Sequence, residues 1–223
     1  MKANTRQLLI LAALLPLAVG CGTVTSVRAL GAGRSTWALS AGGPVTGVSG
    51  LSVPLPYAVA RYRYGVNDRL GLYAGGHLLM AAFGVVGLDA GATGRLLAQR
   101  GLRPELNGSA GLVGLVEIGS GRGQVLFPEA SLTASWLWQR RFLTYAGAQG
   151  MMQLSPGVYG AFAPYVGQEV HIGRGVSATL EAKWYGPNEP TTPRVLDFKL
   201  PVGGHGDVGI LLGVNYQVGG WYE

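Results

Sequence analysis

The strongest constraint on the fold of this chain is a regular alternation of apolar and polar side chains. Between Val176 and Tyr185, one face reads Val, Ala, Leu, Ala, Trp and the other reads Ser, Thr, Glu, Lys, Tyr. Similar alternation occurs in residues 86–96, 128–138, 162–172 and 208–218. Because side chains of a β-strand point to opposite faces in turn, these segments predict strands with one apolar and one polar face.

The composition indicates whether the apolar face meets lipid or the interior of the protein. Only 13% of the residues are charged, which is about half the share found in soluble domains. After residue 20, however, the chain has no apolar run of about twenty residues, the length needed for a membrane-spanning helix. A closed β-barrel satisfies all backbone groups in lipid without helices. We therefore predict an all-β, antiparallel up-and-down transmembrane β-barrel.

The segments predict about ten strands, and their connections alternate between short polar turns and mostly longer loops, as in outer-membrane barrels. Eight strands would leave two segments unused, and twelve would need strands that the sequence does not offer. With both chain ends on the short-turn side, the number must be even. The predicted strands lie near residues 34–43, 57–66, 69–79, 85–97, 103–118, 126–138, 142–152, 161–173, 175–185 and 205–219.

The N-terminus has the pattern of an export signal. Lys2 and Arg6 precede an apolar stretch from Leu8 to Leu17, and small residues lead to Cys21, the only cysteine. Leu17 to Cys21 resembles a lipobox, which implies acylation at Cys21 by a diacylglyceryl group. The alternative is cleavage by the general signal peptidase. We predict a signal peptide at 1–20, an anchor or linker at 21–33, the barrel at 34–219 and a tail at 220–223.

Removal of Lys2 and Arg6 leaves 15 basic residues against 11 acidic ones, so the net charge falls from +6 to +4. The basic residues form no run along the sequence, which argues against nucleic-acid binding.

The last strand and the aromatic residues carry a family resemblance. Residues Gly213 to Val218 resemble the C-terminal signal read by the barrel-assembly machinery, although the terminal Phe is missing. Several Trp and Tyr residues lie near predicted strand ends, as in interfacial girdles: Trp37, Tyr57, Tyr64, Trp136, Trp138, Trp184, Tyr216 and Trp221. The chain thus resembles small bacterial outer-membrane β-barrel proteins with a lipoprotein-type signal. The resemblance implies an outer-membrane location, aided by Gly22 rather than Asp after the cysteine. It also implies outer-membrane lipids and the assembly machinery as partners.

A lipid-anchored soluble barrel of the lipocalin kind is the alternative fold, with the apolar face turned inward. Such a barrel needs Lys and Glu on its outer face, whereas the polar face here consists mostly of Gly, Ser and Thr.

In the membrane reading, the polar face lines the lumen, and burying a charge there without a partner is costly. We therefore expect a network of charged side chains that fills the barrel. A narrow channel for small solutes is the alternative. The inward charges are Arg61, Arg63, Asp89, Arg95, Glu105, Glu117, Glu129, Glu169, His171, Glu181 and Lys183, together with His77 and Asn107.

The sequence offers little catalytic chemistry. His205 and Asp207 stand at the start of the last strand, and such a pair can activate water at the rim of a barrel. We expect no enzyme, no metal and no cofactor apart from the acyl group on Cys21, because no metal-ligand, nucleophile-elbow or nucleotide-binding motif is present. Proline-rich loops near 43–56 and 186–204 suit partner binding. The predicted function is a structural or interaction role, with contacts to other envelope proteins.

Overall fold

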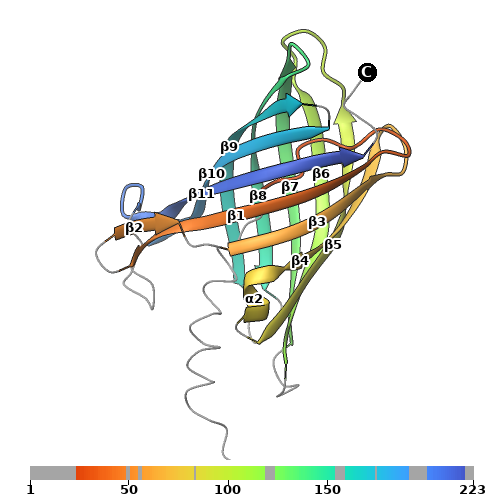
Figure 1. The fold of residues 1–223 in the computed structure, drawn as a ribbon. Helices are drawn as coiled ribbons and strands as arrows, with labels where there is room; N and C mark the ends of the chain where they lie inside the picture. The colour runs from red at the N-terminus through yellow and green to blue at the C-terminus, as the bar shows by residue number, and fades with distance from the viewer. Residues whose placement is uncertain are drawn as a thin grey trace, which may run out of the picture.

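The computed structural model describes residues 24–48, 51–54, 57–82, 84–118, 124–153, 159–173, 175–190 and 200–218. They form an antiparallel sheet closed into a barrel (Figure 1). Ten strands make the ring, and β2 lies outside it. The elements are β1 (Ser35–Val48), β2 (Leu51–Pro54), β3 (Tyr57–Gly65), β4 (Leu70–His77), α2 (Leu78–Ala82), β5 (Val85–Leu97), β6 (Glu105–Glu117), β7 (Gln124–Trp138), β8 (Phe142–Gln153), β9 (Tyr159–Gly173), β10 (Val176–Pro190) and β11 (His205–Val218).

The seam between the first and last strands closes the ring. Trp37 of β1 lies opposite Tyr62 of β3 on one side and opposite Tyr216 of β11 on the other. Every other strand of the ring pairs with its neighbours in the sequence. No edge remains in the ring, so all its strands are hydrogen-bonded on both sides, which confirms the predicted fold class.

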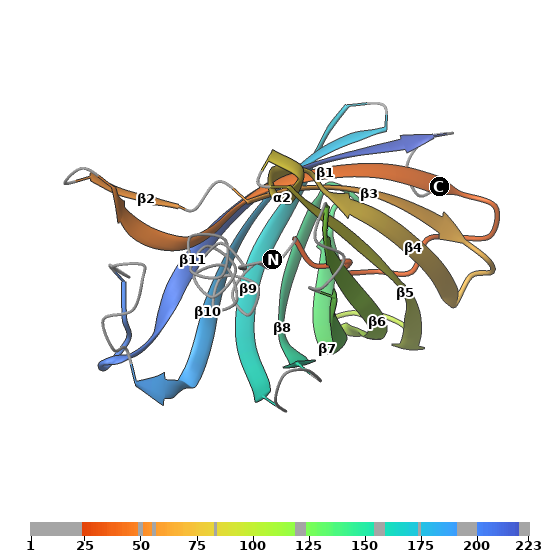
Figure 2. The ribbon, with the colours of Figure 1, turned by 90° about the horizontal axis from the view of Figure 1, so that it is seen from below.

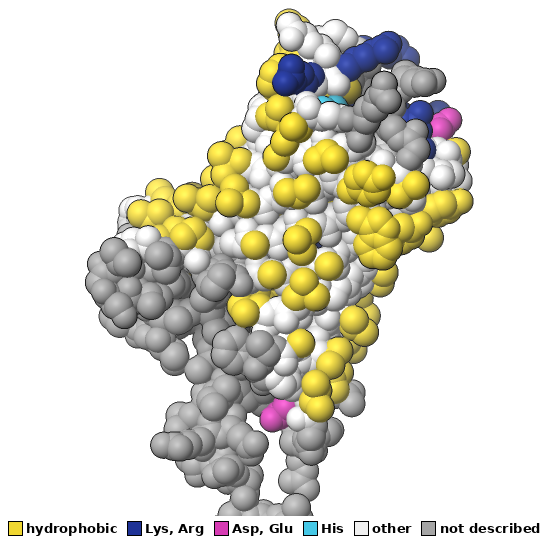
Figure 3. Space-filling model, viewed as in Figure 1, with side chains coloured by type: hydrophobic (Ala, Val, Ile, Leu, Met, Phe, Trp, Pro, Cys, Tyr) yellow, Lys and Arg dark blue, Asp and Glu magenta, His cyan; other side chains and the backbone are white. Residues whose placement is uncertain are grey.

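The side chains alternate across the barrel wall as the sequence predicts. Leu132 and Leu212 face outward and are 53% and 61% exposed, whereas Thr133 and Glu181 face inward and are buried. Figure 3 shows hydrophobic side chains spread over the outer wall. The apolar face is therefore outside, and the lipocalin-like alternative, which needs it inside, is wrong.

Three predicted loops contain regular structure instead, and one of them is 186–204, where β10 continues to Pro190. Residues 44–56 were expected to form a loop, but β1 continues to Val48 and pairs with β2, with Val45 opposite Pro54. Valine, threonine and leucine favour strands there despite the prolines. Residues 78–82, which begin inside the predicted strand 69–79 and extend into the loop after it, form the helix α2. No helix among the described residues is long and apolar enough to cross a membrane.

The two ends of the barrel differ. The short-turn end holds the turns 66–69, 98–104 and 139–141 and the starts of β1 and β10; the long-loop end holds α2 and the hairpin of β1 with β2. Exposed aromatic side chains lie on the outer wall near the short-turn end, on β11, β1 and β3 and again on β7 and β8, and we call them the aromatic girdle: Trp37, Tyr62, Tyr64, Trp138, Phe142 and Tyr216. The prediction for Tyr57 was wrong, because this side chain is buried in the lumen, where its hydroxyl meets His77.

Candidate functional site

The candidate site is the lumen, and the chain itself occupies it. Residues 24–34, here called the lumen segment, precede β1 and run back through the interior of the ring (Figure 2). At the short-turn end the segment is held by backbone hydrogen bonds, from Gly33 to the carbonyl of Gly65 (2.9 Å) and from Gly65 to the carbonyl of Arg34 (2.8 Å). From there the segment extends inward to Val24, which lies beside Gly213 in the middle of β11.

The inner part of the lumen segment is bonded to β10. The backbone N–H of Thr25 donates to Oε2 of Glu181 over 3.1 Å, and its hydroxyl lies 3.4 Å from Oε1 of the same carboxylate. Glu181 is fully buried. A charge-assisted bond from a backbone N–H is stronger than a neutral one, so Glu181 holds the segment at mid-lumen height.

Arg28 fixes the segment nearer the short-turn end. Its guanidinium donates to Oγ of Ser135 (2.9 Å) and to Oε1 of Gln99 (2.6 Å), and its Nε lies 3.6 Å from the carboxylate of Glu105. The guanidinium of Arg63 in turn donates to the carbonyl of Arg28. Arg28 was absent from our predicted lumen residues, since it precedes the first predicted strand.

Between these polar contacts the segment inserts an apolar side chain. Val27 is 3% exposed and packs against Leu143, Tyr145 and Tyr165, which project from β8 and β9. The segment therefore combines apolar burial with hydrogen bonds at both ends, as a strand in a protein core does.

A network of polar side chains continues across the lumen. Asp89 of β5 accepts a hydrogen bond from Nε of Arg61 (2.9 Å), and its second oxygen lies 3.1 Å from Nε2 of His77. Nδ1 of His77 is hydrogen-bonded to the hydroxyl of Tyr57. The guanidinium of Arg61 also lies over the ring of Tyr73, 4.6 Å from its centre. Buried side chains thus connect the three strands β3, β4 and β5.

The network extends from Tyr73 to the opposite wall. The Tyr73 hydroxyl donates to Glu129 (3.1 Å), and Gln149 donates to the other oxygen of Glu129 (2.7 Å). Lys183, which is 1% exposed, donates to Gln149 (3.1 Å) and lies 3.1 Å from Glu181. Lys183 is therefore buried with its charge compensated, as a buried ammonium requires.

Smaller polar groups line the lumen near the short-turn end. Glu169 accepts a hydrogen bond from Ser177 (2.6 Å) and lies 3.6 Å from His171. Glu105 accepts one from Asn107 (2.9 Å).

The structure does not bring all predicted charges into one network. Arg63 reaches the lumen segment, as described above. Arg95 and Glu117 are half-buried near opposite ends of the barrel, at the end of β5 and the end of β6. Sequence alternation gives the face of a residue but not its height along the barrel.

Glycines make room for the tyrosines of the lumen. Gly167 and Gly147 lie directly opposite Tyr145 and Tyr165 across neighbouring strands, and a Cβ at either glycine would overlap the facing ring. Gly91 and Gly111 face Tyr73 in the same way. The inward glycines thus allow large rings to lie flat against the wall.

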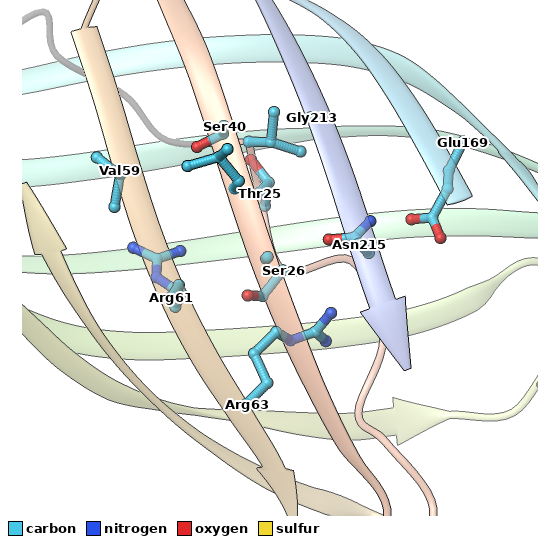
Figure 4. A pocket seen from close by; sticks show the side chains of 12 residues that line it. Thr25, Ser26, Ser40, Val59, Arg61, Arg63, Glu169, Gly213 and Asn215 are labelled. Atoms are coloured by element: carbon cyan, nitrogen blue, oxygen red, sulfur yellow. The ribbon is translucent and has the colours of Figure 1, made fainter. Parts of the chain in front are cut away.

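Two small cavities adjoin the lumen segment. One cavity of about 20 Å³ lies between the segment, β1, β3 and β11, lined by Arg61, Arg63 and Asn215 among others (Figure 4). A second, of about 10 Å³, lies beside Arg28 and Leu143. Each volume is about that of a single water. Toward the long-loop end, Val59, Val113 and Phe127 form part of a buried apolar cluster. The lumen segment, the polar network and this apolar cluster thus occupy much of the described lumen.

The two residues of the predicted rim pair lie in different environments. His205 is exposed and its Nδ1 lies 3.1 Å from the carbonyl of Gly203, whereas Asp207 is buried and accepts a hydrogen bond from the backbone of Leu200 (2.8 Å). His77 is occupied by Asp89 and Tyr57. Within the described ranges, no three His, Cys, Asp or Glu side chains are grouped to hold a metal ion. Cys21 lies outside the described residues.

Comparison with known proteins shows similarity at the level of the fold. No protein-family model matches the sequence, and no curated protein matches it. The translocator domain of the autotransporter NalP from Neisseria meningitidis is 11% identical, with a TM-score of 0.45, covering 84% of this chain and 89% of that one. The outer-membrane protease OmpT from Escherichia coli is 11% identical, with a TM-score of 0.37, covering 84% and 94%. A bacterial polysaccharide outer-membrane secretin is 11% identical, with a TM-score of 0.39, covering 84% and 98%.

Proposed function

We propose that this chain is a bacterial outer-membrane β-barrel protein with a structural or interaction role, closed at rest by its own lumen segment. The observation that carries the proposal is the pairing of an apolar outer wall with a lumen filled by residues 24–34. An apolar outer wall without edges suits lipid rather than water. The proposal includes no catalytic step and no metal.

The proposed membrane location has a direct test. Purified protein folded in detergent is expected to migrate differently on a gel before and after heating, since closed barrels resist unfolding at room temperature. The protein is also expected to stay with membranes during carbonate extraction. Identical mobility in both samples, together with release by carbonate, contradicts the proposal.

The lipid anchor is part of the same proposal. Residues 1–20 serve as the signal peptide, and Cys21 receives the acyl groups that hold the N-terminus at the membrane. The support is the sequence pattern and an otherwise unpaired cysteine in an exported chain. Labelling with a radioactive fatty acid is expected for the wild type and absent for Cys21→Ser. Label that persists in Cys21→Ser refutes the anchor while leaving the barrel untouched.

The structural role and the channel alternative predict different conductance, because a filled lumen does not let ions pass. We expect wild-type protein in planar bilayers to show no steady conductance at moderate voltage. Deletion of residues 24–30, which removes Thr25, Val27 and Arg28, is expected to open discrete conductance steps. Val27→Ile, which keeps the apolar contact, serves as the matched control and stays silent. Steady conductance by the wild type favours the channel for small solutes.

The interaction role concerns partners in the envelope. The barrel-assembly machinery is the proposed partner during insertion, and outer-membrane lipids surround the wall afterwards. The hairpin of β1 and β2 projects beyond the ring and gives other envelope proteins a surface at the long-loop end (Figure 1).

A further inference from the structure

The fold gathers arginines that are far apart in the sequence. Five arginines are exposed among the described residues, and all lie in turns at the short-turn end: Arg69, Arg100, Arg103, Arg140 and Arg141. Among the residues whose side chains the structure describes, Asp68 is the only exposed acidic one. One of its carboxylate oxygens already accepts a hydrogen bond from the backbone of Ala32 (3.2 Å). Figure 3 shows the basic side chains at the upper end of the molecule. We call these five residues the arginine rim.

The turn between β5 and β6 is fastened to the outer wall. Arg100 and Arg103 exchange two backbone hydrogen bonds of 3.1 and 3.0 Å, which makes a tight tip. Leu102 at this tip is 80% exposed, and its carbonyl accepts a hydrogen bond from the indole of Trp136 (2.8 Å). Because Trp136 projects outward from β7, the tip of the turn lies against the outside of the barrel, whereas Gln99 at the start of the turn reaches Arg28 in the lumen. An exposed leucine is thereby flanked by two arginines.

The turn between β7 and β8 repeats this arrangement. Trp138 and Phe142 are paired across the strands and are both exposed on the outer wall. Arg140 and Arg141 lie between them in the turn, and the guanidinium of Arg141 is 5.7 Å from the centre of the Phe142 ring. The carbonyl of Arg140 is hydrogen-bonded to Nδ1 of His171, which fixes the turn to β9.

The rim therefore lies immediately beyond the aromatic girdle. Aromatic girdles of membrane barrels lie at the level of the lipid headgroups, so side chains one to three residues beyond them reach the phosphates. Arginine presents a planar fork of donors that matches a phosphate group, and it is weakly hydrated. The exposed Leu102 fits the adjoining hydrocarbon.

We propose that the arginine rim is a binding surface for the phosphates of anionic lipids in the leaflet at the short-turn end. The inference rests on the proposed membrane location and adds a lipid preference to it. Lipid is favoured over an acidic protein because the tip of the β5–β6 turn is held against the outer wall, where lipid contacts it, and because Leu102 lies among the charges.

Quenching of tryptophan fluorescence by brominated lipids tests the inference. Full-length protein is inserted into phosphatidylcholine vesicles containing one fifth phosphatidylglycerol, with the bromine placed on one lipid class or the other. Trp37 and Trp138 are exposed near the rim and report on the nearest lipids. We expect phosphatidylglycerol to be enriched about two- to threefold over its bulk fraction, and less so at high salt.

The control variants distinguish the positive charge of the arginines from the planar shape of the guanidinium group. Arg100→Gln, Arg103→Gln and Arg140→Gln combined are expected to abolish the enrichment, whereas the same three changes to Lys retain part of it. Equal quenching by both lipids in the wild type overturns the inference but leaves the barrel proposal standing. No quenching by either lipid means that the wall is not in lipid, which refutes the proposed function itself. Enrichment removed by millimolar inorganic phosphate, but not by chloride at equal ionic strength, would assign the rim to free phosphate and overturn the lipid assignment.

Discussion

The backbone N–H of Thr25 donates a hydrogen bond to the carboxylate of Glu181 over 3.1 Å, across 156 residues of sequence. Tyr145 donates to the same carboxylate over 2.9 Å, and Lys183 lies 3.1 Å away. A single buried side chain therefore joins the lumen segment, β8 and β10. Its removal tests how far the lumen segment and the barrel wall depend on each other.

Glu181→Ala leaves Lys183 without its counter-charge, and breaking a buried pair costs about 3–5 kcal/mol. We expect a lower urea midpoint and a loss of that order in the free energy of unfolding, measured in lipid vesicles. Glu181→Gln keeps the size of the side chain and an acceptor oxygen, so a smaller loss is expected. A value for Glu181→Ala within about 0.5 kcal/mol of wild type, the usual range of surface substitutions, contradicts the buried network.

A disulfide tests the position of the lumen segment. The Cβ of Val24 lies 3.5 Å from the place that a Cβ on Gly213 would occupy, which suits a disulfide. In a Cys21→Ser background, Val24→Cys with Gly213→Cys is expected to cross-link under mild oxidation, as detected by mass spectrometry after proteolysis. Val24→Cys with Gly150→Cys is the control, because the space around Gly150 on β8 is open. If neither pair or both pairs cross-link, the described path of the segment is wrong.

Leu132 tests which face of the wall meets lipid. It projects outward near the middle of β7, so Leu132→Arg is expected to destabilise the protein in vesicles by about 2–4 kcal/mol. Leu102→Arg, at the short-turn end, is expected to cost at most about 1 kcal/mol because headgroups accept the charge. Equal effects of the two substitutions on the urea midpoint would place the outer wall in water.

The glycines opposite the lumen tyrosines give a test of interior packing. Gly167→Ala places a methyl group into the ring of Tyr145, and overpacking of this kind costs about 1–3 kcal/mol. Gly150→Ala adds the same atom where nothing lies within 4 Å, so it is expected to be neutral or slightly stabilising. Thermal unfolding of both variants measures the difference. A stable Gly167→Ala would show that Tyr145 can move away from the wall.

The barrel wall follows from the sequence because each strand carries its own signal. Residues such as Thr179 and Leu180 differ in polarity and alternate, so their faces were predictable, and the strand ends agree with prediction to within a few residues for most of the ring. The pairing of Arg61 with Asp89 was not predictable. It depends on the register between strands, which a period of two does not specify.

The lumen segment carries no comparable signal. Its residues, from Val24 to Leu30, have neither strand alternation nor a helical period, and they lie within the segment predicted as an anchor or linker, 21–33. Their place in the lumen arises from Arg28 and Val27 finding partners on strands far away in the sequence. The arginine rim was missed for a related reason: Arg69, Arg103 and Arg140 look scattered along the chain, and only the hairpin turns bring them to one end.

The closed seam between β1 and β11 has a consequence for the order of assembly. A segment inside a closed ring enters either before the ring closes or lengthwise through one end. Lengthwise entry would require neighbouring side chains to move, because Val27 is packed against Tyr145 and Tyr165. The route that avoids such movement is for the other strands to form around the segment first. The pairing of β1 with β11, in which Trp37 lies opposite Tyr216, is then the last step. Pairing of β11 then encloses the lumen segment in the ring. In a chain truncated before β11, the ring would stay open and the lumen segment could leave the lumen.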